Sequence, residues 1–143
     1  NPFAQPQELQ LMRLQKKVAS GARFVQTQSI YDVESFEDWM EQVRRLGLHE
    51  KVFIQAGVMV NKSFRSIEMT GKVPGIRIPE ALTERMYRAA DQQAEGVAIA
   101  LEIIERVRRI EGVRGLHIMA VGWESIVPEI IKRAGLLPRP PVE

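Results

Sequence analysis

The sequence predicts an α/β fold in which about three parallel strands alternate with covering helices. Three segments rich in β-branched and other apolar residues, 23–29, 51–60 and 115–121, are typical of strands. Between these segments, apolar residues recur three and four positions apart, as they do on the buried face of a helix. Strands that alternate with helices are expected to be parallel and joined by right-handed crossovers.

The first two helices are bounded by residues that start or stop helices. The first is expected to begin at Pro6 and to end at Gly21, because proline suits the first helical position and glycine follows the last. The second is expected to be capped by Asp32 and to stop at Gly47. The apolar faces are Leu11, Leu14 and Val18 in the first helix, and Phe36, Trp39, Met40, Val43 and Leu46 in the second.

The second strand, 51–60, is almost continuously apolar, which is typical of a strand buried on both faces. A short helix followed by a loop is expected within 61–78. The remaining helices are expected from Pro79, from Asp91 to Gly112, and over 125–134 with a stop at Gly135. The proline-rich tail that begins at Pro138 cannot continue the last helix.

Length and composition are those of a soluble protein with one domain. The chain has 143 residues, of which 45% are hydrophobic and 27% are charged. The net charge is +2 with both signs interspersed, which argues against the one-sided basic patch of a nucleic-acid-binding protein. No apolar run approaches the roughly 20 residues that span a bilayer, and no signal peptide is recognisable. Two histidines without cysteine predict no metal site, and we expect a cytoplasmic protein.

The carboxyl end of the first strand carries the candidate ligand-binding residues. Ligands bind at this end of the strands in parallel α/β folds, so Thr27, Gln28 and Tyr31 lie where side chains reach a ligand. Thr27 alternates to the opposite face from Gln28 and is expected to be structural. His117 falls at the start of the third predicted strand and is interpreted as an interior histidine, not as a catalyst.

Four segments together resemble a known family. They are 16–22 with its paired lysines, Thr27-Gln28 followed by Tyr31-Asp32, Ala56-Gly57-Val58, and Gly115-Leu116-His117. In this order and spacing they resemble the carboxy-terminal half of a methylenetetrahydrofolate reductase, over residues 1–137. The resemblance implies a partial (β/α)8 TIM barrel that holds flavin at the carboxyl ends of its strands. Residues 1–143 are then expected to be a single half-barrel segment with strands six, seven and eight, preceded by a strand ending at 1–3.

The resemblance also implies roles for single residues. The expected flavin-binding residues are Arg13, Lys16, Lys17, Ala22 and Met119, and the expected folate-binding residues are Gln28, Tyr31 and Trp123. The basic residues would approach the flavin phosphate, and the cofactor is expected to be FAD, with FMN left open. A second interpretation of Lys16 and Lys17 is that they lie at a helix end, where the helix dipole favours cations.

Two of the expected folate-binding residues have alternative structural interpretations. The Gln28 carboxamide offers both a donor and an acceptor, which suits the edge of a pterin or flavin ring. Its alternative is hydrogen bonding to neighbouring backbone, since buried polar groups are normally paired. Tyr31 either stacks on a ring or belongs to the core or rim. Asp32, although part of the family signature, is expected to be a helix cap.

Several positions depart from the family pattern. Trp123 stands where the family has a substrate-binding arginine, and Met119 where it has a tyrosine near the flavin. The ring-stacking aromatic of the family falls near Met69 and Thr70, which leaves Phe64 as the candidate substitute. A stacking Trp123 cannot replace a charge-assisted hydrogen bond. These departures indicate a divergent branch with a different pterin, or with a partner redox subunit in place of reduced nicotinamide.

The function implied by the resemblance is flavin-dependent reduction of 5,10-methylenetetrahydrofolate to 5-methyltetrahydrofolate in one-carbon metabolism. The catalytic acid of the family lies on earlier strands, so no catalytic residue is assigned here. Without an amino-terminal half-barrel, this segment is expected to be inactive. The alternative is a non-catalytic half-barrel that pairs with itself or with a partner chain, because a three-stranded parallel sheet leaves two open edges. We expect a homo-oligomer.

Overall fold

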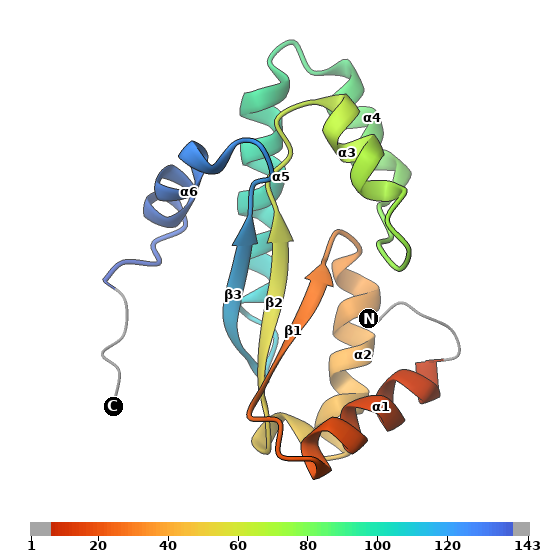
Figure 1. The fold of residues 1–143 in the computed structure, drawn as a ribbon. Helices are drawn as coiled ribbons and strands as arrows, with labels where there is room; N and C mark the ends of the chain where they lie inside the picture. Colours follow the sequence, from red (N-terminus) through yellow and green to blue (C-terminus); the bar gives the residue numbers. More distant parts are fainter. Residues whose placement is uncertain (1–6, 139–143) are drawn as a thin grey trace.

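The structure is a computed structural model that describes residues 7–138, with strands and helices in alternation (Figure 1). The strands are β1 (Phe24–Ser29), β2 (Phe53–Met59) and β3 (Val113–Met119). The helices are α1 (Gln7–Ala19), α2 (Val33–Arg45), α3 (Phe64–Gly71), α4 (Glu80–Arg88), α5 (Gln92–Val107) and α6 (Val127–Arg133). Two 3-10 turns, η1 (Leu48–Glu50) and η2 (Glu124–Ile126), complete the order. The predicted α/β class is confirmed.

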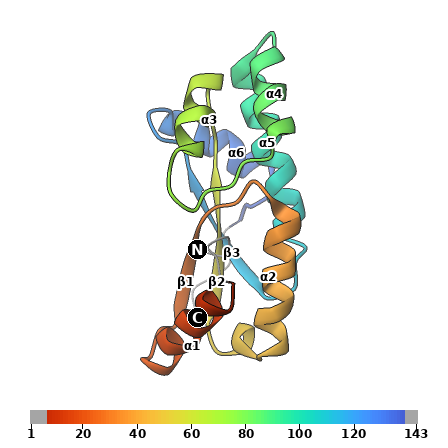
Figure 2. The ribbon, with the colours of Figure 1, turned by 90° about the vertical axis from the view of Figure 1, so that its right-hand side faces the viewer.

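The three strands form one parallel sheet in the order β1-β2-β3. Gln26 of β1 pairs with Gln55 of β2, which pairs with Gly115 of β3. Helices α2 and α5 lie together on one side of this sheet (Figure 2). The described residues leave much of the opposite side of the sheet uncovered, and Phe24 is 63% exposed there.

The core lies between the sheet and the two helices that cover it. Its largest fully buried side chains include Phe36, Met40 and Val43 from α2, Ile54 and Val58 from β2, and Ile104 and Val107 from α5. The prediction that the second strand is buried on both faces is wrong for this chain. Ile54 and Val58 are fully buried, but Phe53 is 53% exposed because the described residues place no layer on its side.

Several element boundaries differ from those predicted. The second strand begins two residues later than expected because 48–50 forms a 3-10 turn. Helix α5 ends at Val107, not at Gly112, and β3 starts directly after Gly112, whose φ of 94° reverses the chain. His117 is therefore the fifth of seven residues in β3, so its predicted place at the strand start is wrong. The predicted start at Pro6 and the strand at 1–3 lie outside the described residues.

Side-chain caps fix the starts of three helices, of which α2 and α3 follow strands and α5 follows α4. Asp32 accepts a hydrogen bond from the Ser35 backbone N–H at 3.0 Å, which confirms its expected role as a helix cap. Asp91 caps α5 through the Ala94 N–H at the same distance. Ser63 forms a capping box at the start of α3. The Asp32 and Ser63 caps set where the chain turns from β1 and β2 into the next helix.

Two glycines allow close backbone approaches near the strand ends. A Cβ on Gly57 of β2 would lie 2.8 Å from the carbonyl oxygens of both Thr27 and Gln28. A Cβ on Gly96 of α5 would lie only 1.8 Å from the Asn61 carbonyl oxygen. Only glycine fits at these two positions, and the contacts draw β1 and α5 against the carboxyl end of β2.

Candidate functional site

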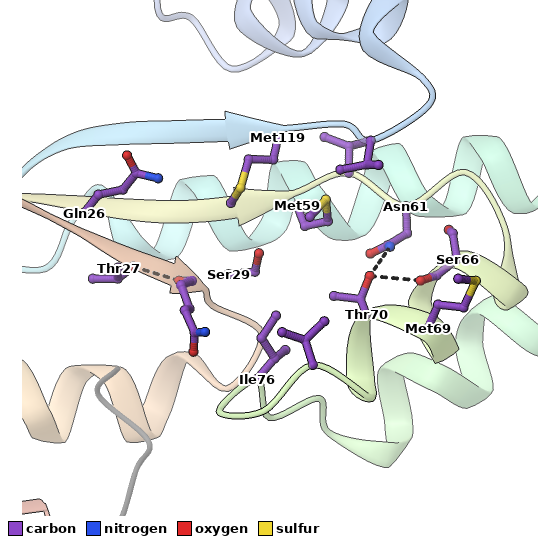
Figure 3. A pocket seen from close by; sticks show the side chains of 14 residues that line it. Gln26, Thr27, Ser29, Met59, Asn61, Ser66, Met69, Thr70, Ile76 and Met119 are labelled. Atoms are coloured by element: carbon purple, nitrogen blue, oxygen red, sulfur yellow. Dashed lines mark hydrogen bonds between the residues drawn. The ribbon is translucent and has the colours of Figure 1, made fainter.

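The main candidate site is a cavity of about 630 Å³ at the carboxyl ends of the strands, covered by α3 and the loop after it (Figure 3). It is lined by Gln26, Thr27, Gln28, Ser29, Met59, Val60, Asn61, Ser66, Met69, Thr70, Val73, Ile76, Met119 and Val121. The lining combines apolar side chains with a few amide and hydroxyl groups and includes no charged residue. This composition is typical of a site for a mostly apolar small molecule with a polar edge.

Gln28 lies in the cavity wall with half of its carboxamide unpaired. Its Nε2 donates to the Pro74 carbonyl oxygen at 3.3 Å, whereas its Oε1 is buried and has no hydrogen-bond partner among the described residues. The first contact matches the alternative of bonding to nearby backbone, and the second leaves one acceptor unpaired. Because an unpaired buried acceptor is unfavourable, this atom is a candidate ligand contact. Trp39 Nε1 and His49 Nδ1 are also buried without a partner among the described residues, but these side chains do not line the main cavity.

Thr27 has the structural role that was predicted. Its Oγ1 donates to the Gln28 carbonyl oxygen at 2.8 Å and accepts from the Gly57 N–H at 2.9 Å. The ladder between β1 and β2 shifts register between Gln26 and Ser29, where ordinary backbone pairing is interrupted. The Thr27 hydroxyl replaces the missing backbone partner and fixes the strand end that carries Gln28.

Tyr31 lies behind the cavity wall and is not among the residues that line it. Its side chain is buried, and its hydroxyl donates to Asn61 Oδ1 at 2.5 Å. Burial raises the pKa of Tyr31 above its ordinary value, so the phenol stays protonated near neutral pH. Direct contact between Tyr31 and a ligand remains a prediction.

A second cavity, of about 430 Å³, lies between α1 and β1 and carries a cluster of cations. Arg13, Lys16 and Lys17 line it, and so do Gln26 and Thr27, which also line the main cavity. None of the three cations forms an ion pair with an acidic residue in the part of the chain that is described. The two cavities therefore meet along β1, one apolar with a polar edge and the other cationic.

The remaining predicted site residues are distributed unevenly. Met119 lines the main cavity, whereas Ala22 and Trp123 line neither of the two cavities. The Ala22 N–H donates to the Lys17 carbonyl oxygen at 3.0 Å, and Trp123 is half-buried against the core. Phe64 packs edge-to-face on Tyr87, with ring centroids 5.1 Å apart, and is not among the residues lining the main cavity.

Sequence reasoning missed the polar residues that the second strand and α3 contribute to the cavity. Asn61, only 5% exposed, donates through Nδ2 to Thr70 Oγ1 at 3.1 Å, and Thr70 Oγ1 donates to the Ser66 carbonyl oxygen at 2.9 Å (Figure 3). A signal for Asn61 was present, because it is the first polar residue after an apolar strand. Gln26 was also missed, although it follows the same alternation as Gln28.

Two other features are absent from residues 7–138. That range contains no helix long and apolar enough to cross a membrane. It also contains no group of three or more histidine, aspartate or glutamate side chains placed to hold a metal ion.

The fold and the cavity define an α/β protein with a cavity at the carboxyl ends of parallel strands, the place where such folds bind ligands. The chain matches the family model described as methylenetetrahydrofolate reductase over residues 1–135. It therefore belongs to the methylenetetrahydrofolate reductase family.

Individual relatives agree with the family match. The chain is 33% identical over 132 residues to methylenetetrahydrofolate reductase 1 of Schizosaccharomyces pombe, covering 89% of this chain and 21% of that protein. It is 25% identical over 143 residues to the 5,10-methylenetetrahydrofolate reductase of Escherichia coli, covering 96% of this chain and 47% of that protein. The chain thus spans less than half the length of either reductase.

A solved structure shares the fold. It is a Clostridium thermocellum protein described as binding two copies of 5-methyl-5,6,7,8-tetrahydrofolic acid, with a TM-score of 0.66 and 20% sequence identity. The superposition covers 86% of this chain and 45% of that one. At this identity the likeness concerns the fold, and it is consistent with a partial TIM barrel.

Proposed function

We propose that this chain forms the carboxyl-end ligand site of an enzyme that reduces 5,10-methylenetetrahydrofolate to 5-methyltetrahydrofolate with a bound flavin. The observation that carries the proposal is the buried, unpaired Gln28 Oε1 in the main cavity of a reductase-family chain. A pterin ring presents N–H donors along its edge, and such a donor would satisfy this acceptor. The folate bound by the Clostridium thermocellum protein supports the choice of ligand.

The described residues fit a flavin across the two cavities. Arg13, Lys16 and Lys17 would hold its phosphate groups, since fixed cations without acidic partners suit an anionic group. Met119 would contact its ring system from the main cavity, and Ala22 would lie near the cationic end. The bound flavin would supply the hydride for the reduction. FAD is the proposed form, and FMN remains the second choice.

This chain would bind and orient the substrate without supplying an acid. The main cavity is lined by amides, hydroxyls and apolar side chains, so it can align a pterin and limit the access of water. No carboxylate or histidine is among the residues that line it. The proton that accompanies the hydride must therefore come from outside this cavity wall. We accordingly propose that residues 1–143 act as one segment of a larger barrel and are inactive alone.

The proposed function also includes an electron donor and an assembly. Reduced nicotinamide or a partner redox subunit would reduce the flavin, and a homo-oligomer is expected. Trp123 would contribute to folate binding only by moving from its present place beside the core, since it lines neither cavity. A cytoplasmic location also remains a prediction.

The test uses the intact protein. Its visible absorption spectrum is recorded for bound flavin, and 5-methyltetrahydrofolate is measured after incubation with 5,10-methylenetetrahydrofolate and a reductant. We expect flavin absorption and formation of the methylated product. A protein that takes up no flavin even from an excess, and yields no product, contradicts the proposal.

The uncovered sheet face supports a second candidate, a non-catalytic half-barrel that pairs with itself or a partner chain. Phe24 and Phe53 lie side by side on that face and are 63% and 53% exposed. Large exposed apolar side chains are typical of surfaces that another layer covers. This candidate predicts a stable assembly that binds neither flavin nor folate, so the same two measurements separate the candidates.

A further inference from the structure

A series of hydrogen bonds, the first buried and the next two partly buried, runs from the end of β1 to α3 beside the main cavity. The Tyr31 hydroxyl donates to Asn61 Oδ1 at 2.5 Å, and Asn61 Nδ2 donates to Thr70 Oγ1 at 3.1 Å. Thr70 Oγ1 then donates to the Ser66 carbonyl oxygen at 2.9 Å. In the first two of these hydrogen bonds the donor lies nearer the end of β1 and the acceptor nearer α3, and the third lies within α3. We call these four residues the Tyr31 relay.

The Tyr31 hydroxyl sets the direction of donation along the relay. A phenol that stays protonated donates to the carbonyl side of the Asn61 amide, which leaves the Nδ2 side to donate to Thr70. The Asn61 backbone is also fixed, since its carbonyl oxygen occupies the space that a side chain at Gly96 would need. Asn61 is therefore held from β1 through Tyr31 and from α5 through Gly96.

The other contacts of α3 include packing on α4, where the Phe64 ring lies against Tyr87. Of the eight residues of α3, only Ile67 is a buried apolar side chain. The Phe64 N–H donates to Gln92 Oε1 at 2.8 Å, which ties down the first turn but not the last. The relay reaches the last turn through Thr70. This is the part of the helix that faces the cavity with Met69 and Thr70.

We propose that Tyr31 is a positioning residue that fixes α3 at a set distance from the strand ends and thereby sets the width of the folate cavity. The inference rests on the proposed function for the identity of the ligand. Tyr31 acts through Asn61 and Thr70 and does not line the cavity itself. Thr70, near the position where the family has an aromatic residue, fits this role because its hydroxyl accepts a hydrogen bond from Asn61 and donates one within α3.

The test compares four variants of the intact protein with the wild type: Tyr31→Phe, Thr70→Val, the double variant, and Tyr87→Phe. Tyr87 is 68% exposed on α4, and its loss of a hydroxyl keeps the ring contact with Phe64, so it is a matched control. Dissociation constants for 5-methyltetrahydrofolate are measured by titration. Amide hydrogen exchange in α3 and α5 is measured without ligand.

We expect Tyr31→Phe and Thr70→Val each to weaken folate binding about tenfold, because each leaves a relay partner unpaired. The double variant should bind about as weakly as either single variant, since both act on one connection. Amides of α3 should exchange faster in Tyr31→Phe while those of α5 stay unchanged. Tyr87→Phe should match the wild type in every measurement.

Two results would overturn the inference: unchanged α3 exchange in Tyr31→Phe, or additive losses of affinity in the double variant. A wild-type protein that binds no folate contradicts the proposed function instead. In that case α3 exchange still decides whether the relay positions the helix.

Discussion

The helical side of the sheet is closely packed with apolar side chains, whereas the carboxyl ends of its strands carry polar groups that are partly unpaired. On the helical side, Phe36 and Met40 of α2 and Val107 of α5 are fully buried. At the carboxyl ends, Gln28 keeps a buried acceptor unpaired. The cations of α1, which lies toward the amino ends of the strands (Figure 1), line a separate cavity beside β1 and have no acidic partner among the described residues. Apolar packing thus stabilises the helical side, whereas the polar groups along β1 keep unpaired atoms and charges that we propose bind a ligand.

Charged residues differ in where they gather. Away from the two cavities, several arginines pair with glutamates, such as Arg85 with Glu95 and Glu102, and Arg106 with Glu34, whereas Lys51 and Lys132 form no ion pair within the described residues. The cations that line the second cavity, Lys16 and Lys17, form no such pair within residues 7–138. Unpaired cations that gather around a cavity indicate an anionic ligand more strongly than paired cations on a helix surface do.

Gly96→Ala should disrupt the close contact between α5 and the Asn61 backbone, and it should lower the free energy of unfolding more than any other change proposed here. The added Cβ would lie 1.8 Å from the Asn61 carbonyl oxygen, and backbone cannot move aside as a flexible side chain can. We expect a loss of more than about 3 kcal/mol in the free energy of unfolding, measured with urea, although alanine is normally the better helix former.

Gly71→Ala in α3 is the matched control for this prediction. A Cβ there would make only an ordinary contact, 3.5 Å from Ile78 Cδ1. The substitution should leave the free energy of unfolding unchanged within about 1 kcal/mol. Equal effects of the two substitutions would show that the contact between Gly96 and Asn61 is not a constraint.

Removing the free cations should affect ligand binding and leave stability nearly intact. The double variant Lys16→Ala and Lys17→Ala should bind flavin about tenfold more weakly, with the difference shrinking at high salt because ions screen exposed charges. Flavin affinity is measured by absorption or fluorescence titration of the intact apoprotein at two salt concentrations.

The control removes two lysines that line neither cavity, Lys51 and Lys132, and has the same net charge. It should bind flavin like the wild type. If both double variants bind equally well, the lysines of α1 interact only with the helix end, and the alternative interpretation of their role holds.

The ion pairs on the helical side should give the smallest effect. Hydrogen bonds from the Arg85 guanidinium hold the pKa of Glu102 below its ordinary value. A carboxylate with a lowered pKa stabilises the folded state above its unfolded pKa and loses this contribution as the pH falls through the folded value.

Glu102→Gln tests that contribution. Because the Arg85 and Glu102 side chains are 40% and 55% exposed, we expect a loss of at most about 1 kcal/mol at pH 7. The difference between variant and wild type in urea unfolding should vanish as the pH is lowered below the pKa of Glu102 in the folded state. A difference that persists at acid pH would mean that packing, not the ion pair, causes the loss.

The sequence predicted the helical side of the sheet better than it predicted the strand ends and the open sheet face. Helical spacing located α2 and α5, and the caps Asp32 and Asp91 were identified because cap preferences are local. The ends of the third strand were misplaced because a turn around Gly112 replaces the last part of the expected helix. Exposure of the second strand was misjudged because it depends on which other segments cover the sheet.

The site was predicted only as far as residue type and strand position allow. Gln28 and Met119 lie in the cavity wall near strand ends, and their contacts with folate and flavin stay predictions. Tyr31 was expected beside a ligand, but its hydroxyl bonds to Asn61, thirty positions further along the chain. Such a long-range hydrogen bond has no signature in local sequence, so the relay needed the structure.

The most direct test of the central claim is a titration of the intact protein with 5-methyltetrahydrofolate for the wild type, Gln28→Met and Gln55→Met. Methionine keeps the length of glutamine and removes its polar atoms, and Gln55 lies one strand away without lining the cavity. We predict about tenfold weaker binding for Gln28→Met and wild-type binding for Gln55→Met. Wild-type affinity in the Gln28 variant would contradict the claim that its free acceptor binds the pterin.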